Sequence, residues 1–230
     1  MRFHLYKVLW MFFVSGMLAC SGPALAADDA QLWMSAGVRV RPTKRLRLNF
    51  DQQLRLDQNL SRVDKVNTDV TLTYKARKWL SLGGGYRFSM RTGDSDALGP
   101  SQRLHVQGQV SGDLGPVGVS YRLRFQDSFA WDNSKLDLEH TLRNRVALNY
   151  DTDTMVTPGI AAELFTRLAE RQEELLKKIR ITVGVRLKPN KKHAVDVFYR
   201  MHLPLADPEN PVEHIVGLGY EYRLPRKKKK

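Results

Sequence analysis

Residues 45–57 read Arg45-Leu46-Arg47-Leu48-Asn49-Phe50-Asp51-Gln52-Gln53-Leu54-Arg55-Leu56-Asp57, and apolar and polar residues alternate along almost the whole stretch. Successive side chains of a β-strand point to opposite faces, so this stretch has one apolar face and one charged face. The same alternation recurs along the chain, in segments separated by short and long connections in turn. This pattern is typical of an outer-membrane barrel, with lipid outside and a wet lumen inside. We therefore expect an all-β fold: a transmembrane, antiparallel, up-and-down β-barrel.

Eleven segments carry the pattern, and most are long enough for a tilted strand to cross a bilayer. They are 31–40, 45–57, 65–76, 79–91, 103–112, 117–126, 138–150, 156–166, 179–188, 194–203 and 215–224. The long connections between them are 58–64, 92–102, 127–137, 167–178 and 204–214, which we expect on the outer side of the membrane. Because single-chain bacterial barrels have even strand numbers, an odd count suggests a missing or misassigned strand. We expect between ten and twelve strands.

The first 26 residues have the features of a cleaved secretory signal peptide. Arg2 and Lys7 precede an apolar stretch over 8–18, which is too short for a membrane helix, and Ala24-Leu25-Ala26 is a small-x-small cleavage site. The expected organisation is therefore a signal peptide (1–26), an outer-membrane barrel (27–224) and a basic C-terminal tail (225–230).

Export and composition exclude several classes of protein. Cys20, the only cysteine, lies inside the expected signal, so the exported chain has neither a disulfide nor a thiolate metal site. Loss of Arg2 and Lys7 lowers the formal net charge from +13 to +11. Although a basic chain can bind nucleic acid, these charges are spread at strand spacing in an exported protein, so we expect no nucleic-acid partner.

The charged face of the strands is expected to line the lumen. The candidate lumen-lining residues are Arg47, Asp51, Arg55, Asp69, Arg87, Arg103, Arg122, Arg124, Arg143, Arg145, Glu163, Arg180, Arg186, Asp196 and Arg200. They allow two readings: an anion-attracting pore, or a lumen filled by arginine–carboxylate pairs. Side chains fill the interior of a barrel of about 8 strands, whereas a barrel of about 16 strands keeps an open channel. The expected ten to twelve strands lie between these limits, and we favour the lumen filled by arginine–carboxylate pairs.

The apolar face is expected to contact lipid, with Trp33, Tyr74, Trp79 and Tyr150 in the aromatic girdles at the two interfaces. The opposite arrangement, a soluble periplasmic lipocalin-like binding barrel with its apolar face inside, has the same periodicity. Strand length and the alternation of connections favour the membrane barrel.

No set of residues indicates catalysis, a metal site or a cofactor, and we expect a protein that is not an enzyme. The alternative is a barrel-embedded lipid hydrolase, in which His105 or His202 activates one of the inward-facing serines, Ser89, Ser111 and Ser120. No third residue is placed to orient such a histidine. His140 and His214 fall near connections, and 166–178 is the one helix-like stretch.

Several short motifs together resemble a family of uncharacterised bacterial outer-membrane β-barrel proteins, domain-of-unknown-function family 2490. They lie at 46–55 (LRLNFDQQLR), 79–87 (WLSLGGGYR), 121–126 (YRLRFQ), 142–145 (LRNR), 162–165 (AELF), 195–200 (VDVFYR) and 214–220 (HIVGLGY). The resemblance covers nearly all of the exported chain. It implies a barrel in the bacterial outer membrane and brings no agreed activity. The expected partners are outer-membrane lipid, the barrel-assembly machinery during insertion and a small anionic solute. The expected function is that of a narrow pore, a small-solute transporter or a structural envelope protein.

Overall fold

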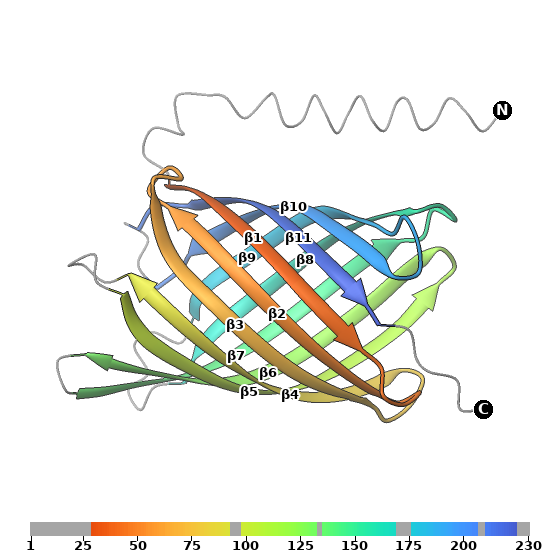
Figure 1. Ribbon diagram of the computed structural model, residues 1–230, viewed down its shortest axis with the longest axis horizontal. Coiled ribbons are helices and arrows are strands. Elements are labelled where there is room, and N and C mark those ends of the chain that lie inside the picture. Colours follow the sequence, from red (N-terminus) through yellow and green to blue (C-terminus); the bar gives the residue numbers. More distant parts are fainter. Residues whose placement is uncertain (1–28, 93–97, 133–134, 169–175, 207–209, 225–230) are drawn as a thin grey trace.

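The computed structural model of the chain describes residues 29–92, 98–132, 135–168, 176–206 and 210–224. The expected signal peptide (1–26) and basic tail (225–230) lie outside these ranges. The described residues form eleven strands that close into one barrel (Figure 1). The strands are β1 (Asp29–Val40), β2 (Leu46–Asp57), β3 (Arg62–Lys75), β4 (Leu80–Thr92), β5 (Leu98–Leu114), β6 (Val117–Asp132), β7 (Lys135–Tyr150), β8 (Val156–Arg167), β9 (Leu176–Leu187), β10 (His193–Pro204) and β11 (Glu213–Arg223).

Each strand pairs with its neighbour in the sequence, so the expected up-and-down barrel of ten to twelve strands is confirmed. The seam that closes the barrel differs from the rest. β1 and β11 are parallel, in a continuous register from Asp29 opposite Glu213 to Arg39 opposite Arg223. With an odd number of strands the first and last run in the same direction, so the expectation of a fully antiparallel barrel is wrong at this seam.

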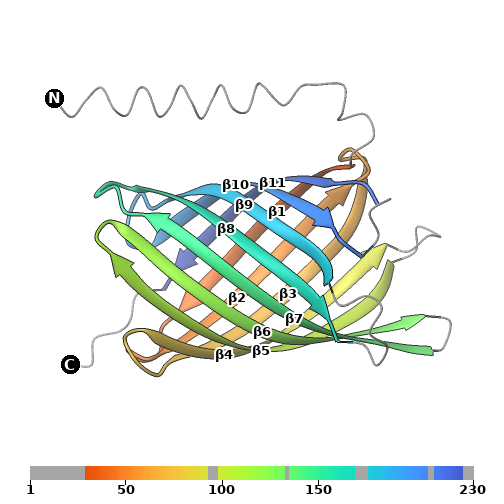
Figure 2. The ribbon, with the colours of Figure 1, turned by 180° about the vertical axis from the view of Figure 1, so that it is seen from behind.

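The expected long connection at 127–137 is wrong. β6 continues to Asp132 and β7 begins at Lys135, and these two residues are still register partners. The resulting hairpin projects beyond the rest of the barrel, as Figures 1 and 2 show from opposite sides. β9 begins at Leu176, so the end of the helix-like stretch 166–178 is a strand, and 169–175 lies outside the described residues.

Most outward-facing side chains of the strands are apolar, and many stay exposed, including Phe50 (47%), Leu72 (47%), Leu123 (41%) and Leu218 (49%). Inward-facing positions instead bury polar groups: Asn67, His105, Gln126, Thr141, Arg143, Glu163 and His202. A soluble barrel would bury the apolar set. The lipocalin-like alternative is therefore wrong, and the surface is that of a barrel surrounded by lipid. Among the described residues no helix is long and apolar enough to cross a bilayer.

Polar side chains on the lipid-facing surface are paired across strands. The pairs are Thr68 with Gln52 (2.8 Å), Tyr86 with Gln102 (3.1 Å) and Tyr121 with Asn144 (2.7 Å). Since hydrocarbon supplies no hydrogen-bond partner, these contacts satisfy groups that would otherwise be costly to place there.

The aromatic girdle is only partly as expected. Tyr74, Trp79 and Tyr150 are exposed, close to the short turns. Trp33 is 3% exposed and lies inside the barrel, so its assignment to the girdle is wrong. Along β1 it shares its face with Gln31 and Arg39, whereas Leu32 and Met34 share the opposite face.

Candidate functional site

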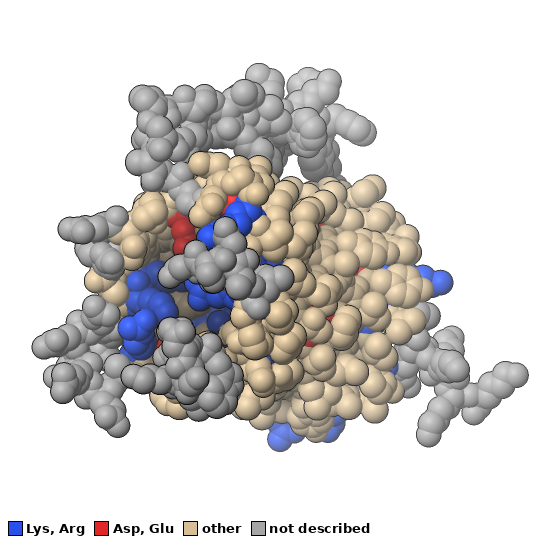
Figure 3. Space-filling model, turned by 60° about the vertical axis from the view of Figure 1, so that its left-hand side comes forward, with Lys and Arg blue, Asp and Glu red and all other residues tan. Residues whose placement is uncertain are grey.

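A cavity of about 730 Å³ lies inside the barrel, toward the end at which β1 begins and the long connections join the strands. Among the described residues, thirteen lysines and arginines line it, against five carboxylates. Figure 3 shows lysine and arginine side chains gathered in a hollow at this end of the molecule. The basic residues are Arg55, Lys65, Arg87, Arg91, Arg103, Arg122, Arg124, Arg143, Arg145, Lys177, Lys178, Arg180 and Arg200. We call this space the arginine cavity.

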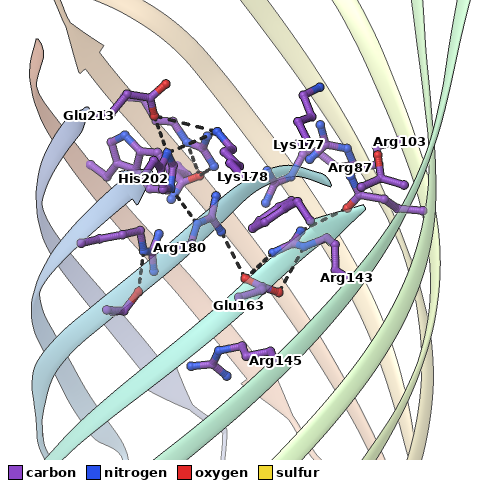
Figure 4. Close-up of a pocket in the computed structure, with 18 of the residues that line it drawn as sticks. Arg87, Arg103, Arg143, Arg145, Glu163, Lys177, Lys178, Arg180, His202 and Glu213 are labelled. Carbon is purple, nitrogen blue, oxygen red and sulfur yellow. Dashed lines mark hydrogen bonds and ion pairs between the residues drawn. The ribbon is translucent and has the colours of Figure 1, made fainter. Parts of the chain in front are cut away.

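Strand register brings these side chains together. Residues opposite one another on neighbouring strands point to the same face, so a row of register partners forms a band across the inner wall. One such row crosses six strands, β6 to β11, and consists of Arg122, Arg145, Glu163, Arg180, His202 and Glu213. Figure 4 shows several of these residues pointing into the cavity from separate strands.

Glu163, which is 4% exposed, lies among three arginines. Its Oε1 accepts hydrogen bonds from Arg122 Nη2 (2.7 Å) and Arg143 Nε (3.1 Å). Its Oε2 accepts from Arg143 Nη2 (2.8 Å) and from Arg180 Nη1 (3.5 Å). One carboxylate thus offsets part of the charge of three guanidiniums, and the cluster keeps a net positive charge.

A second polar cluster lies nearer the long connections. His202, 3% exposed, accepts a hydrogen bond at Nε2 from Arg180 Nε (2.7 Å). Its Nδ1 contacts a carboxylate oxygen of Glu213 and lies 3.3 Å from Lys178 Nζ. Because Nε2 accepts from Arg180, a neutral ring carries its proton on Nδ1, facing Glu213. Arg180 therefore links this cluster to Glu163.

Two aromatic rings inside the cavity are covered by guanidiniums. The Arg55 guanidinium carbon lies 3.6 Å from the centre of the Trp33 ring, and that of Arg200 lies 5.0 Å from it. Phe165 is contacted in the same way by Arg143 (4.4 Å) and Arg180 (4.7 Å). Cation–π attraction and the rigid rings hold these arginines against the wall.

Several cavity arginines form no ion pair with a carboxylate among the described residues. Arg103, Arg124 and Arg200 donate only to neutral oxygens, those of Ser128 (2.9 Å), Gln107 (3.0 Å) and Thr182 (3.0 Å). Arg55 donates to Gln53 (2.8 Å), and Arg145 has no hydrogen-bonded or ion-pair partner within the described ranges. These guanidiniums remain positively charged groups facing the cavity.

The structure places ten of the fifteen lumen candidates in the wall of the arginine cavity: Arg55, Arg87, Arg103, Arg122, Arg124, Arg143, Arg145, Glu163, Arg180 and Arg200. The other five lie elsewhere on the inner face. Asp69 pairs with Arg87 (2.7 Å), Asp196 pairs with Arg186 (2.7 Å), and Asp51 is the register partner of Asp69. Arg47 lies toward the short turns. The lumen therefore combines ion pairs with uncompensated arginines.

Sequence reasoning missed Asp64, Lys65, Lys177, Lys178 and Glu213 as residues of the cavity wall. Two β-bulges explain why Asp64 and Lys177 reach the wall although they are out of phase with the inward residues of their strands. The register of β2 with β3 shifts between Val63 and Lys65, and that of β8 with β9 shifts between Leu176 and Lys178, so Asp64 and Lys177 each form an extra residue. A bulge lets two consecutive side chains reach the same face, which a strict period of two does not anticipate.

The residues considered for catalysis do not come together. Ser120 lies opposite Ser111 and Ala147, whereas His105 lies opposite Gly85 and Gln126. Ser89 donates to Asn67 (2.8 Å). His140 and His214 lie within β7 and β11, where they contact Asp127 (2.6 Å) and Tyr199 (2.5 Å). The described part of the chain contains no group of three or more histidine, cysteine or acidic residues arranged to hold a metal ion.

Comparisons with known proteins give a family and a structural neighbour. The model of a family described as "Protein of unknown function (DUF2490)" matches residues 30–208. Among curated proteins no match is found. Six solved chains match, and one of them is described as "NanC porin structure in rhombohedral crystal form". That structure has 9% sequence identity and a TM-score of 0.49, and the match covers 76% of this chain and 87% of the other.

Proposed function

Because the chain belongs to the DUF2490 family and closes into an eleven-stranded barrel, we propose that it is a narrow pore for small anionic solutes in the bacterial outer membrane. The observation that carries the proposal is the arginine cavity, with its thirteen basic and five acidic residues. Positive side chains around a water-filled passage attract anions and repel cations. The apolar outer surface and long tilted strands support a place in the outer membrane, reached through the expected signal peptide (1–26).

The pairing pattern argues against a lumen that serves only as packing. In a lumen filled for stability, carboxylates would compensate the arginines, because an unpaired buried charge is costly. Here Arg124, Arg145 and Arg200 face a cavity of about 730 Å³ without a carboxylate partner in the described ranges. A cavity of that volume holds several water molecules or a small solute. We therefore favour a water-filled, anion-binding passage over a structural envelope protein.

Conductance across planar bilayers tests this function. A gradient of potassium chloride across a single-channel membrane should give a reversal potential that shows anion preference. Arg124→Gln combined with Arg145→Gln removes two uncompensated charges and should lower that preference. Arg186→Gln is the control for loss of a lumen arginine outside the cavity, because Arg186 pairs with Asp196 (2.7 Å) and does not line the cavity.

Two outcomes would contradict the proposal. One is the absence of conductance from a chain whose heat-dependent gel mobility shows that it is folded. The other is an anion preference that falls as much with Arg186→Gln as with the cavity variant. A lipid hydrolase remains the alternative from another class, and no serine–histidine hydrogen bond in the described residues favours it.

A further inference from the structure

A second, smaller pocket lies at the opposite end of the barrel, where the short turns join the strands. Its volume is about 160 Å³. Arg41, Lys44 and Arg45 come from the connection between β1 and β2, Arg47 from β2, and Lys75 from β3. The remaining wall consists of Leu46, Thr73 and Ser81, so five cations and no carboxylate of the described ranges surround the space. We call it the turn pocket.

The cations of the turn pocket are not compensated within the described ranges. Arg41, Lys44, Arg47 and Lys75 form no ion pair there, and Arg45 donates from Nη1 to the Tyr74 hydroxyl (3.4 Å). The Nε of Arg47 is buried and has no hydrogen-bond partner among the residues that the structure describes. A buried donor without an acceptor destabilises the protein, and a ligand oxygen would satisfy it.

Glu221, an inner-wall carboxylate whose charge acts on Arg47, is already engaged. Glu221 pairs with Arg39 across the β1–β11 seam and with Arg223 Nε (2.7 Å) on its own strand. It does not line the turn pocket. The positive charge of the pocket is therefore available to a ligand.

The connection that carries three of the cations is held in place. Thr43 Oγ1 accepts hydrogen bonds from the backbone N–H groups of Arg45 (3.2 Å) and Leu46 (3.0 Å). The backbone N–H of Lys75 donates to the Arg45 carbonyl oxygen (2.7 Å), which joins the connection to β3. The pocket thus has a fixed backbone frame before any ligand binds, which lowers the entropy cost of binding.

We propose that the turn pocket is a binding site for a phosphate group, carried either by a soluble phosphate or by a lipid headgroup. Guanidinium and ammonium groups suit tetrahedral oxyanions, because several N–H donors can reach several oxygens at once. A group with two negative charges compensates five converging cations better than a single carboxylate or a halide does. The site is separate from the arginine cavity and does not depend on conduction through the lumen.

Equilibrium dialysis of radiolabelled inorganic phosphate against the folded chain in an uncharged detergent tests the site. Arg47→Gln combined with Lys44→Gln should remove one bound phosphate per chain, or weaken that binding event about tenfold or more, as expected for the loss of charged hydrogen bonds. The control is Lys191→Gln combined with Lys192→Gln, which removes the same charge from an exposed turn at the same end. Heat-dependent gel mobility verifies that each variant folds.

A second arm identifies the source of the phosphate. In nanodiscs, a lipid headgroup as occupant lowers the apparent affinity of the wild type for inorganic phosphate when phosphatidic acid, whose phosphomonoester can carry two charges, replaces phosphatidylcholine. Equal affinity in both lipids assigns the site to a soluble phosphate. The proposal is overturned if the wild type binds no phosphate saturably, if the pocket variant binds as much as the wild type, or if the turn control loses as much as the pocket variant. Absence of conductance would contradict the pore and leave this result unaffected.

Discussion

Glu163 accepts hydrogen bonds from Arg143 with both carboxylate oxygens, at 3.1 and 2.8 Å, and both side chains are less than a tenth exposed. Two parallel N–H···O bonds between a planar guanidinium and a carboxylate form the strongest common type of ion pair. This pair joins β7 to β8, and Glu163 also binds Arg122 of β6 and Arg180 of β9. The wall of the arginine cavity is therefore held across four strands by one carboxylate.

Replacing the Glu163 carboxylate should lower the stability of the barrel and raise its preference for anions. Glu163→Gln leaves three arginines facing one another, and breaking a buried pair in this way costs about 3–5 kcal/mol. We expect the free energy of unfolding in liposomes, measured by urea titration, to fall by that order. In the same variant the anion preference should rise, because the lumen loses a negative charge. Asp153→Asn, on an exposed turn, is the control and should change neither quantity.

Two adjacent residues of β3 can test which face of the strands contacts lipid and which lines the lumen. Val70 is 39% exposed on the outer surface, whereas Thr71 points inward. Val70→Lys places an ammonium in hydrocarbon and should cost roughly 2–4 kcal/mol of folding free energy in a bilayer. Thr71→Lys should cost much less, because its ammonium enters the wet lumen. Equal losses of folded protein in the two variants would contradict the assignment.

The two tryptophans Trp33 and Trp79 should report different surroundings. Trp79 is 54% exposed and Trp33 only 3%. With brominated lipids as fluorescence quenchers, Trp79→Phe should reduce the fraction of emission that is quenched. Trp33→Phe should instead raise that fraction, because it removes an emitter shielded from lipid. If Trp33→Phe lowers the quenched fraction, Trp33 faces the bilayer.

Packing beside the seam can be tested at Gly217 of β11. A Cβ atom on Gly217 would overlap the ring of Phe198, which crosses over it from β10. Gly217→Ala should therefore destabilise the barrel by about 1–3 kcal/mol through overpacking. Phe198→Ala in the same chain should recover part of that loss, since it vacates the space.

Gly112→Ala provides the comparison for the seam, because its Cβ would meet no other atom. Urea titrations of the wild type, Gly217→Ala, Phe198→Ala and the variant with both changes form a double-mutant cycle. A coupling energy near zero between Gly217 and Phe198 would mean that the ring moves away at no cost.

Much of this fold follows from a pattern of period two. The alternation in 45–57 and its repeats sets the number of strands and the inner and outer faces, because one face must meet hydrocarbon and the other water. The alternation along β1 also places Trp33 correctly, because Trp33 lies on the face opposite to Leu32 and Met34 and therefore points inward. Its identity as an aromatic residue suggested the girdle, and the phase of β1 contradicts that.

Other features do not follow from the alternation. The β-bulges at Asp64 and Lys177 interrupt the phase, so the sequence looks like a connection where the structure has strand. The extension of β6 and β7 beyond the rim depends on the backbone pairing of these two strands with each other. The pairing of β1 with β11 is a contact between the two ends of the chain, and no local pattern specifies it.

The parallel seam has a topological consequence for the two ends of the barrel domain. Asp29 starts β1 at the same rim at which Glu213 starts β11, so the domain enters at one rim and leaves at the other. A barrel with an even strand count has both ends on one side of the bilayer. Here an epitope placed before Asp29 and another placed after Arg223 would be accessible from opposite sides of the membrane that the barrel spans.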